Sequence, residues 1–97
     1  MDKKNLINSI KELLADHKNW FSDKYTLIHK SGLVIWINGF PKNIFNIRIL
    51  KPNLLKFNTT EKISLFIPIR QCLKGIEENK RQKMITFLKN KNNDNSN

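Results

Sequence analysis

The sequence predicts an α+β fold with an N-terminal helix, a twisted antiparallel sheet of three to five strands, and a C-terminal helix. Near both ends of the chain, apolar residues recur at three- and four-residue spacing, which is the pattern of a helix face. Between them, β-branched and aromatic residues alternate with polar ones and are broken by Gly and Pro. The 97 residues suffice for one domain with a modest core. We expect that domain over residues 1–89 and a disordered polar tail over 90–97.

The first helix is expected over residues 3–18. Its apolar stripe consists of Leu6, Ile7, Ile10, Leu13, Leu14 and His17. Asp2 is a suitable N-cap, since its carboxylate can accept from free backbone N–H groups. Glu12 and Asp16 interrupt the cationic polar face that a membrane-surface helix shows, so packing on the sheet is the preferred interpretation. Trp20 is expected in the core at the junction between helix and strand.

A hairpin is expected next, with Ser31-Gly32 as a two-residue turn, because Gly supplies the positive φ that such a turn needs. Lys30 then faces Leu33, and the pairing alternates from there. One face is expected to meet the core and carries Thr26, Ile28, Leu33, Ile35 and Ile37. The other face mixes rings and polar groups and carries Tyr25, Leu27, His29, Val34, Trp36 and Asn38.

Further strands are expected over residues 44–50 and 54–58, with Phe45 and Phe57 packed inside. Residues 62–67 fit either a strand or a helix, because Asn58 and Glu61 have the spacing of a capping box. Pro68 sits badly inside a helix and well at its start, which favours the strand. The second helix is therefore predicted over residues 68–88.

The charge pattern favours an anionic partner. The formal net charge is +10, and no Asp or Glu occurs between Asp23 and Glu61. Such a charge on a small domain favours polyanions, although a composition biased toward Lys and Asn would produce it without any such role. Cys72 is the single cysteine, which fits a reducing compartment. The N-terminus lacks a signal-peptide pattern and no apolar run is long enough to span a bilayer, so a cytoplasmic location with no membrane partner is expected.

The mixed face of the hairpin is the candidate site. Cationic side chains along phosphates and rings stacked on bases are what single-stranded nucleic acid requires. We expect Tyr25, His29, Trp36 and Arg48 to form the stacking platform, and the phosphate contacts to come from the surrounding lysines, Lys24, Lys30, Lys42, Lys51 and Lys56. Single-stranded DNA is the preferred ligand, ahead of RNA and duplex. The alternative is that the N-terminal helix covers this face as a second core layer.

Little in the sequence indicates an enzyme, and we expect none. His17 and His29 belong to no metal-ligand spacing, and no Gly-rich phosphate loop is present. Cys72 lies on an apolar helix face, where it more often packs than reacts. No metal or other cofactor is therefore predicted.

The segment EKISLFIPIRQCLKGIE resembles the strand-to-helix junction of the positive-cofactor-four family, whose members bind single-stranded DNA. Lys51-Pro52 also resembles the Lys-Pro turn of that family. The chain departs from the family in its N-terminal helix, in an extra segment after Pro52, and in Glu61 or Lys62 where the family has glycine. The resemblance implies a β-β-β-β-α module, a homodimer formed through the helices, and single-strand binding along the sheet.

A second function remains open. A small inhibitor or adaptor of the mobile-element type would use the same positive charge to bind an acidic, nucleic-acid-handling protein of its host. The Lys-, Asn- and Ile-rich composition fits such an origin.

Overall fold

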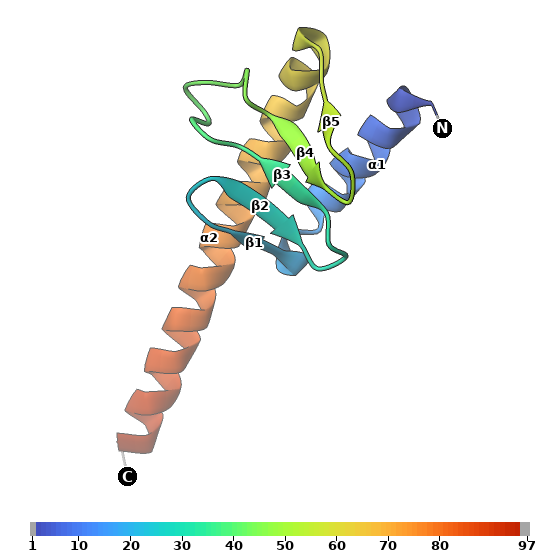
Figure 1. Ribbon diagram of the computed structural model, residues 1–97. Coiled ribbons are helices and arrows are strands. Elements are labelled where there is room, and N and C mark those ends of the chain that lie inside the picture. Colours follow the sequence, from blue (N-terminus) through green and yellow to red (C-terminus); the bar gives the residue numbers. More distant parts are fainter. Residues whose placement is uncertain (1, 96–97) are drawn as a thin grey trace.

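The computed structural model describes residues 2–95, with side chains up to residue 89, and confirms the α+β fold (Figure 1). In chain order the elements are α1 (Lys3–Ala15), a 3₁₀ turn (His17–Asn19), β1 (Trp20–Ser22), β2 (Thr26–His29), β3 (Val34–Trp36), β4 (Arg48–Lys51), β5 (Leu55–Lys56) and α2 (Thr59–Asn95). The five strands form one antiparallel meander in the order β1-β2-β3-β4-β5.

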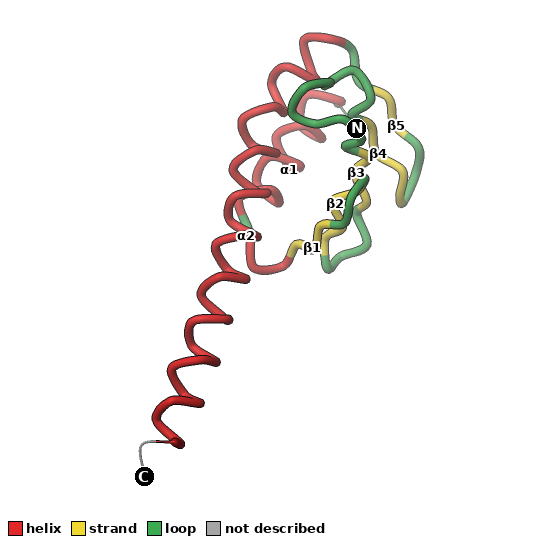
Figure 2. The backbone as a smooth tube through the Cα atoms, turned by 90° about the vertical axis from the view of Figure 1, so that its left-hand side faces the viewer, coloured by secondary structure: helices red, strands yellow, loops and turns green. Residues whose placement is uncertain are grey.

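Both helices lie on the same face of the sheet (Figure 2). The core fills the layer between them, and its buried side chains are Ile7, Ile10, Leu14, Trp20, Leu27, Ile35, Ile37, Ile47, Ile49, Phe57, Leu65, Ile69, Cys72 and Ile76. The opposite face of the sheet has no helix over it within residues 2–95 (Figures 1 and 2). We call this the outer face. It is the surface on which a candidate site can lie.

The first helix begins as predicted and ends earlier. Asp2 caps it, because its carboxylate accepts from the backbone N–H of Lys4 at 3.2 Å. The helix stops at Ala15, where the N–H of Asp16 bonds back to the carbonyl of Leu13 at 3.0 Å and a 3₁₀ turn follows. The prediction that it continues to residue 18 is therefore wrong. This early end allows the chain to turn and place Trp20 in the core, where it was expected.

The hairpin register differs from the prediction by one residue. The observed pairs are Thr26–Trp36, Leu27–Ile35 and Ile28–Val34. The turn has three residues, 30–32, between the paired residues His29 and Leu33. The N–H of His29 donates to the carbonyl oxygen of Leu33 at 2.8 Å, and the N–H of Gly32 donates to the carbonyl oxygen of His29 at 2.9 Å. Gly32 provides the required left-handed conformation, with φ of 102°.

That one extra residue exchanges the two faces of β2, since side chains alternate along a strand. Leu27 and His29 point into the core, whereas Thr26 and Ile28 lie on the outer face. The prediction for β3 is correct, because Ile35 is buried toward the helices.

The segment after β3 is mostly loop. The predicted strand over residues 44–50 forms only at Arg48–Lys51, and the one over residues 54–58 only at Leu55–Lys56. Phe57 is buried as expected, but Phe45 is 66% exposed, so its predicted place inside is wrong. The backbone N–H of Phe45 bonds to the Oδ1 atom of Asn43 at 2.9 Å, and this local turn directs its ring outward.

The predicted strand over residues 62–67 is helical. Asn58 and Glu61 form the capping box in full: the Asn58 side chain accepts from the Glu61 N–H, and the Glu61 carboxylate accepts from the Asn58 N–H, both at 2.8 Å. The helix runs on through Pro68. One missing backbone donor is outweighed by a continuous buried stripe, which consists of Leu65, Ile69, Cys72 and Ile76.

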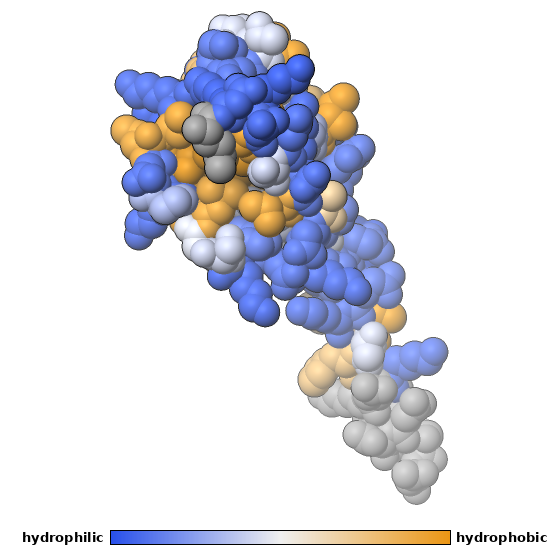
Figure 3. Space-filling view, turned by 90° about the vertical axis from the view of Figure 1, so that its right-hand side faces the viewer, coloured by the Kyte–Doolittle hydropathy of each residue, from blue (hydrophilic) through white to orange (hydrophobic). Residues whose placement is uncertain are grey.

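The second helix continues beyond the sheet (Figure 1). It extends to Asn95, so the tail that was expected to be disordered is helical as far as the description reaches, and Ser96 and Asn97 lie outside the described residues. The projecting part exposes four large apolar side chains, Met84, Ile85, Phe87 and Leu88. On the side of the domain that carries α1 and β5, apolar side chains form a band among hydrophilic ones (Figure 3).

Candidate nucleic-acid interface

A row of side chains crosses the outer face at right angles to the strands. Thr26 pairs with Trp36, Trp36 with Arg48, and Arg48 with Lys56, so one residue each from β2, β3, β4 and β5 stands side by side. Neighbouring strands lie about 4.8 Å apart, which makes the row roughly 14 Å long. We use the term outer row for Trp36, Arg48 and Lys56 together with Tyr25, which adjoins them.

Two adjacent aromatic rings in this row are flanked on both sides by positive charges. The rings of Tyr25 and Trp36 stack with centroids 5.6 Å apart and planes 23° apart. The guanidinium of Arg48 lies 5.9 Å from the Trp36 ring centre, and the ammonium of Lys24 lies 5.3 Å from that of Tyr25. Each cation–π contact at an exposed site contributes on the order of 0.5–1 kcal/mol. The contacts hold the four groups in a continuous surface.

Asp23 determines where Tyr25 stands. Its Oδ1 atom accepts from the N–H of Tyr25 at 2.9 Å, from the N–H of Thr26 at 2.8 Å and from the Thr26 hydroxyl at 2.7 Å. These bonds, led by the one from the hydroxyl, lower the pKa of the Asp23 carboxyl. They fix the turn between β1 and β2 and carry the Tyr25 ring over Trp36.

At the far end of the row, Arg48 borders a pocket of about 240 Å³. Its lining is Phe45, Asn46, Ile47, Arg48, Lys56, Phe57 and Lys62. The Nε atom of Arg48 is buried and has no hydrogen-bond partner among the described residues. Lys62 lies across the pocket and donates to the carbonyl oxygen of Phe45 at 2.7 Å.

His29 is not part of the platform, contrary to the prediction. Its side chain points into the core and is 8% exposed, because the register shift turns it away from the outer face. The ring packs edge-on against Trp20 with centroids 5.0 Å apart. Its Nδ1 atom accepts from the N–H of Ser31 at 3.1 Å, and its Nε2 atom lies 3.6 Å from the Asp16 carboxylate. His29 therefore closes the core beside the turn.

Asp16 is held by its own neighbours. The Asn19 side chain donates to its Oδ2 atom at 2.6 Å. That bond, with a smaller contribution from His29, lowers the pKa of the Asp16 carboxyl.

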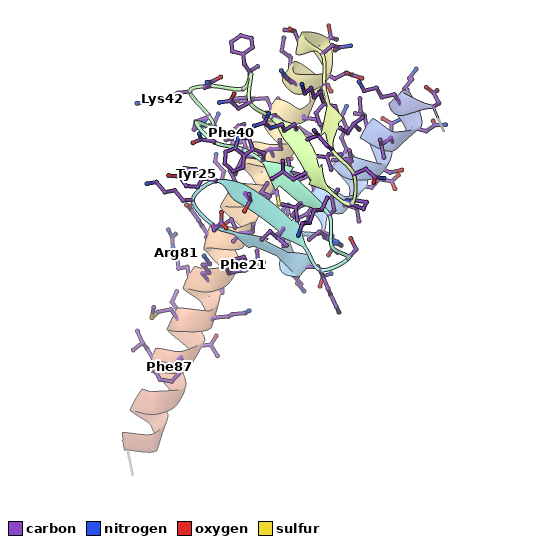
Figure 4. All side chains as sticks on the ribbon, viewed as in Figure 1. Phe21, Tyr25, Phe40, Lys42, Arg81 and Phe87 are labelled. Carbon is purple, nitrogen blue, oxygen red and sulfur yellow. The ribbon has the colours of Figure 1, made fainter. Side chains whose placement is uncertain are left out.

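The predicted lysines divide between the two ends of the strands. Lys30 lies in the β2–β3 turn and Lys51 at the end of β4, and both are exposed. Because successive connections of a meander lie at opposite ends of the strands, these two lysines lie at one end and the β3–β4 loop lies at the other. Lys42 lies in the β3–β4 loop, and Figure 4 shows it on the same side of the domain as Tyr25. Of the predicted lysines only Lys56 belongs to the row itself.

Sequence reasoning did not identify Asp23 and Lys62 as parts of this surface. The capping box of Asn58 and Glu61 predicts a helix start and places Lys62 in its first turn, but no local pattern places that turn beside Phe45. Nothing in the sequence links Asp23 to the site, because Asp23 acts by holding the backbone turn that carries Tyr25. Phe45, which was predicted to pack inside, is one of the most exposed rings and lines the pocket.

The fold and the site together define a class of protein, a small α+β domain whose antiparallel sheet has one face packed under helices and the other face open, basic and aromatic. No family model, curated protein or solved structure matches the chain.

In residues 2–95 no helix has the length and apolar character to cross a membrane. Among residues 2–89, whose side chains are described, no three His, Cys, Asp or Glu side chains are placed to bind a metal ion.

Proposed function

We propose that this domain binds single-stranded nucleic acid, DNA ahead of RNA, through the outer row and with little sequence preference. The observation that carries the proposal is the stacked pair of Tyr25 and Trp36 between Lys24 and Arg48. The segment between Asp23 and Glu61 contains no acid, so nothing within it opposes a phosphate.

The arrangement suits unpaired bases. A base can stack on the Tyr25 or Trp36 ring by displacing the Lys24 or Arg48 side chain from it, and such a stack contributes on the order of 1–3 kcal/mol. Every base has a face with which to do so. In a duplex those faces are already covered by neighbouring base pairs, which leaves only phosphate contacts. Arg48 and Lys56 are placed to make such contacts in either case. A preference for single strands therefore depends on the two rings.

The test is a titration of labelled single- and double-stranded oligonucleotides of one sequence, followed by fluorescence anisotropy at two salt concentrations. We expect tighter binding of the single strand and a steep loss of affinity with salt, because neutralised phosphates release counterions. Trp36→Ala should weaken single-strand binding, whereas Phe87→Ala, which removes an exposed ring from the projecting helix, should not. A flat salt response, or equal effects of the two substitutions, would contradict the proposal.

A second function is supported by a groove beside the edge strand β1. This groove measures about 490 Å³ and is lined by His17, Lys18, Trp20, Phe21, Ile76, Asn79, Lys80, Gln82 and Lys83. An apolar floor with lysines around it suits an acidic protein segment, as an inhibitor or adaptor would require. Failure of both oligonucleotides to bind at low salt would favour this function.

A further inference from the structure

The pocket at the β5 end of the outer row differs from the row in shape. We call it the Phe45 pocket. The row is a surface, whereas the pocket is walled by the β3–β4 loop, by β5 and by the first turns of α2. Its floor includes the buried side chains of Ile47 and Phe57. Because β5 is the last strand of the sheet, the pocket lies where the row ends.

All the charged side chains that line the Phe45 pocket are positive. Arg48, Lys56 and Lys62 contribute three positive charges, and none of the described side chains that line the pocket is acidic. The acid next to Lys62 in the chain, Glu61, is engaged elsewhere: its carboxylate lies 3.0 Å from the ammonium of Lys3 and also accepts from the Asn58 N–H. The pocket therefore attracts an anion strongly.

Two cationic side chains of the pocket, Lys62 and Arg48, have N–H groups without an acceptor among the described residues. Lys62 has three N–H donors and uses one of them on the Phe45 carbonyl. The buried Nε of Arg48 has no acceptor among the described residues, and buried polar groups are normally bonded. A phosphate oxygen in this space would satisfy donors that the chain leaves free.

The size of the pocket restricts the ligand. At about 240 Å³ it falls below the range of roughly 300–1,000 Å³ that is typical of sites for drug-sized molecules. A phosphate group fits such a space, with the exposed ring of Phe45 beside it for a base. A terminal phosphate monoester carries about −1.5 to −2 charges at pH 7, more than the single charge of an internal phosphodiester.

We propose that the Phe45 pocket binds the terminal phosphate of a single strand that lies along the outer row. Arg48 joins the two parts, since it packs on Trp36 and also lines the pocket. This inference rests on the proposed function and adds that the domain recognises a phosphorylated strand end.

The test uses one oligonucleotide in three forms, with a 5′ phosphate, with a 3′ phosphate and with hydroxyl groups at both ends. One of the phosphorylated forms should bind about tenfold more tightly than the hydroxyl form, since its phosphate oxygens can accept charge-assisted hydrogen bonds that the hydroxyl form cannot make. Lys62→Gln should abolish this difference. Lys4→Gln, which removes an exposed charge from α1, should preserve it.

Phe45→Ala provides a second variant, because its ring is exposed and its loss should not affect folding. It should weaken binding of the phosphorylated strand several-fold, compared with Phe87→Ala, whose ring is similarly exposed at 64%. Equal affinity of the three oligonucleotides would overturn the inference and leave the proposed function standing. Failure of all three to bind would overturn the proposed function.

The pocket can also be tested without the row. The protein is titrated with a deoxynucleoside monophosphate and, separately, with the matching deoxynucleoside, and both titrations are followed by NMR. The monophosphate should shift the backbone amide signals of Phe45 and Lys62, and the deoxynucleoside should not. Absence of these shifts, or equal shifts with both compounds, would overturn the inference.

Discussion

The ring of Tyr25 lies over the ring of Trp36, with centroids 5.6 Å apart, although the two residues come from different parts of the sheet. Tyr25 precedes β2 in a turn, whereas Trp36 ends β3. The pairing of Thr26 with Trp36 brings them within reach, and the Asp23 carboxylate bends the turn so that the rings stack. The candidate site depends on this pair, and the predictions follow from how it is built.

The two tryptophans should respond differently to substitution. Trp36→Ala should lower single-strand affinity by about tenfold or more, in line with a stacking contribution of roughly 1–3 kcal/mol. Because Trp36 is only half-buried, its substitution should lower the melting temperature much less than Trp20→Ala does. Trp20 is 6% exposed and donates its indole N–H to the Leu13 carbonyl, so Trp20→Ala should destabilise the fold by about 3–5 kcal/mol. Calorimetry and anisotropy separate the two effects. Equal losses of affinity, measured on folded protein, would contradict the assignment.

The substitution Asp23→Ala tests whether Asp23 matters for holding the Tyr25 ring in place or only through its negative charge. Removing a negative charge from a basic protein should by itself strengthen binding to a polyanion. Loss of the three bonds to Tyr25 and Thr26 should instead loosen the turn and weaken binding several-fold. Glu12→Ala, which removes an acid from α1, is the control and should leave affinity equal or slightly higher. Tighter binding by Asp23→Ala would show that the turn does not hold the ring in place.

Acid should destabilise the fold through three carboxyl groups. The pKa of Asp16, of Asp23 and of Glu61 is lowered in the folded protein, in each case chiefly by a hydrogen bond: from the Asn19 side chain, the Thr26 hydroxyl and the Asn58 N–H respectively. A lowered pKa contributes stability that is present above the unfolded-state values of 3.8 for Asp and 4.5 for Glu and is lost as the pH falls through the folded values.

The melting temperature should therefore fall on acidification below about pH 4.5, where Glu61 begins to lose its advantage, and further below pH 3.8. Asp23→Asn and Glu61→Gln should each flatten this dependence. A melting temperature in the variants that falls as steeply as in the wild type would show that these bonds do not contribute.

Gly75→Ala tests the packing of α2 against the turn after α1. In an isolated helix this change would stabilise by about 1 kcal/mol. Here an added Cβ would collide with the imidazole of His17, and such overpacking costs typically about 1–3 kcal/mol. The single variant should therefore melt lower, and His17→Ala combined with Gly75→Ala should recover only part of the loss, because the His17 Cβ lies 2.8 Å from the added atom and remains. A higher melting temperature for Gly75→Ala alone would mean that His17 moves aside freely.

Much of the fold was predictable because its signals are local. The stripe of Ile7, Ile10 and Leu14 and the cap at Asp2 predicted α1, and both are present. The helix start at Asn58 was also visible in the sequence, but the weight given to Pro68 led to a strand prediction for residues 62–67. A single proline costs one hydrogen bond and a local clash, and the buried stripe from Leu65 to Ile76, roughly three turns long, outweighs it.

The composition of the site was less predictable than its location. The charge of the central segment and the rings of Tyr25 and Trp36 were evident in the sequence. His29 was assigned to the platform only because a two-residue turn was assumed, and the observed three-residue turn moves it into the core. Phe45 and Lys62 meet at one pocket although 17 positions separate them, and no local pattern reports such a meeting.

By itself, the sequence determined the helices' apolar faces, the strand-rich centre and the acid-free basic stretch, because each depends on neighbouring residues and their periodicity. Only the tertiary structure decided which side of β2 faces the helices and which rings meet on the outer face. The physical reason is the pleat: side chains alternate with a period of two, so one residue more in a turn reverses every position of a strand without altering its pattern.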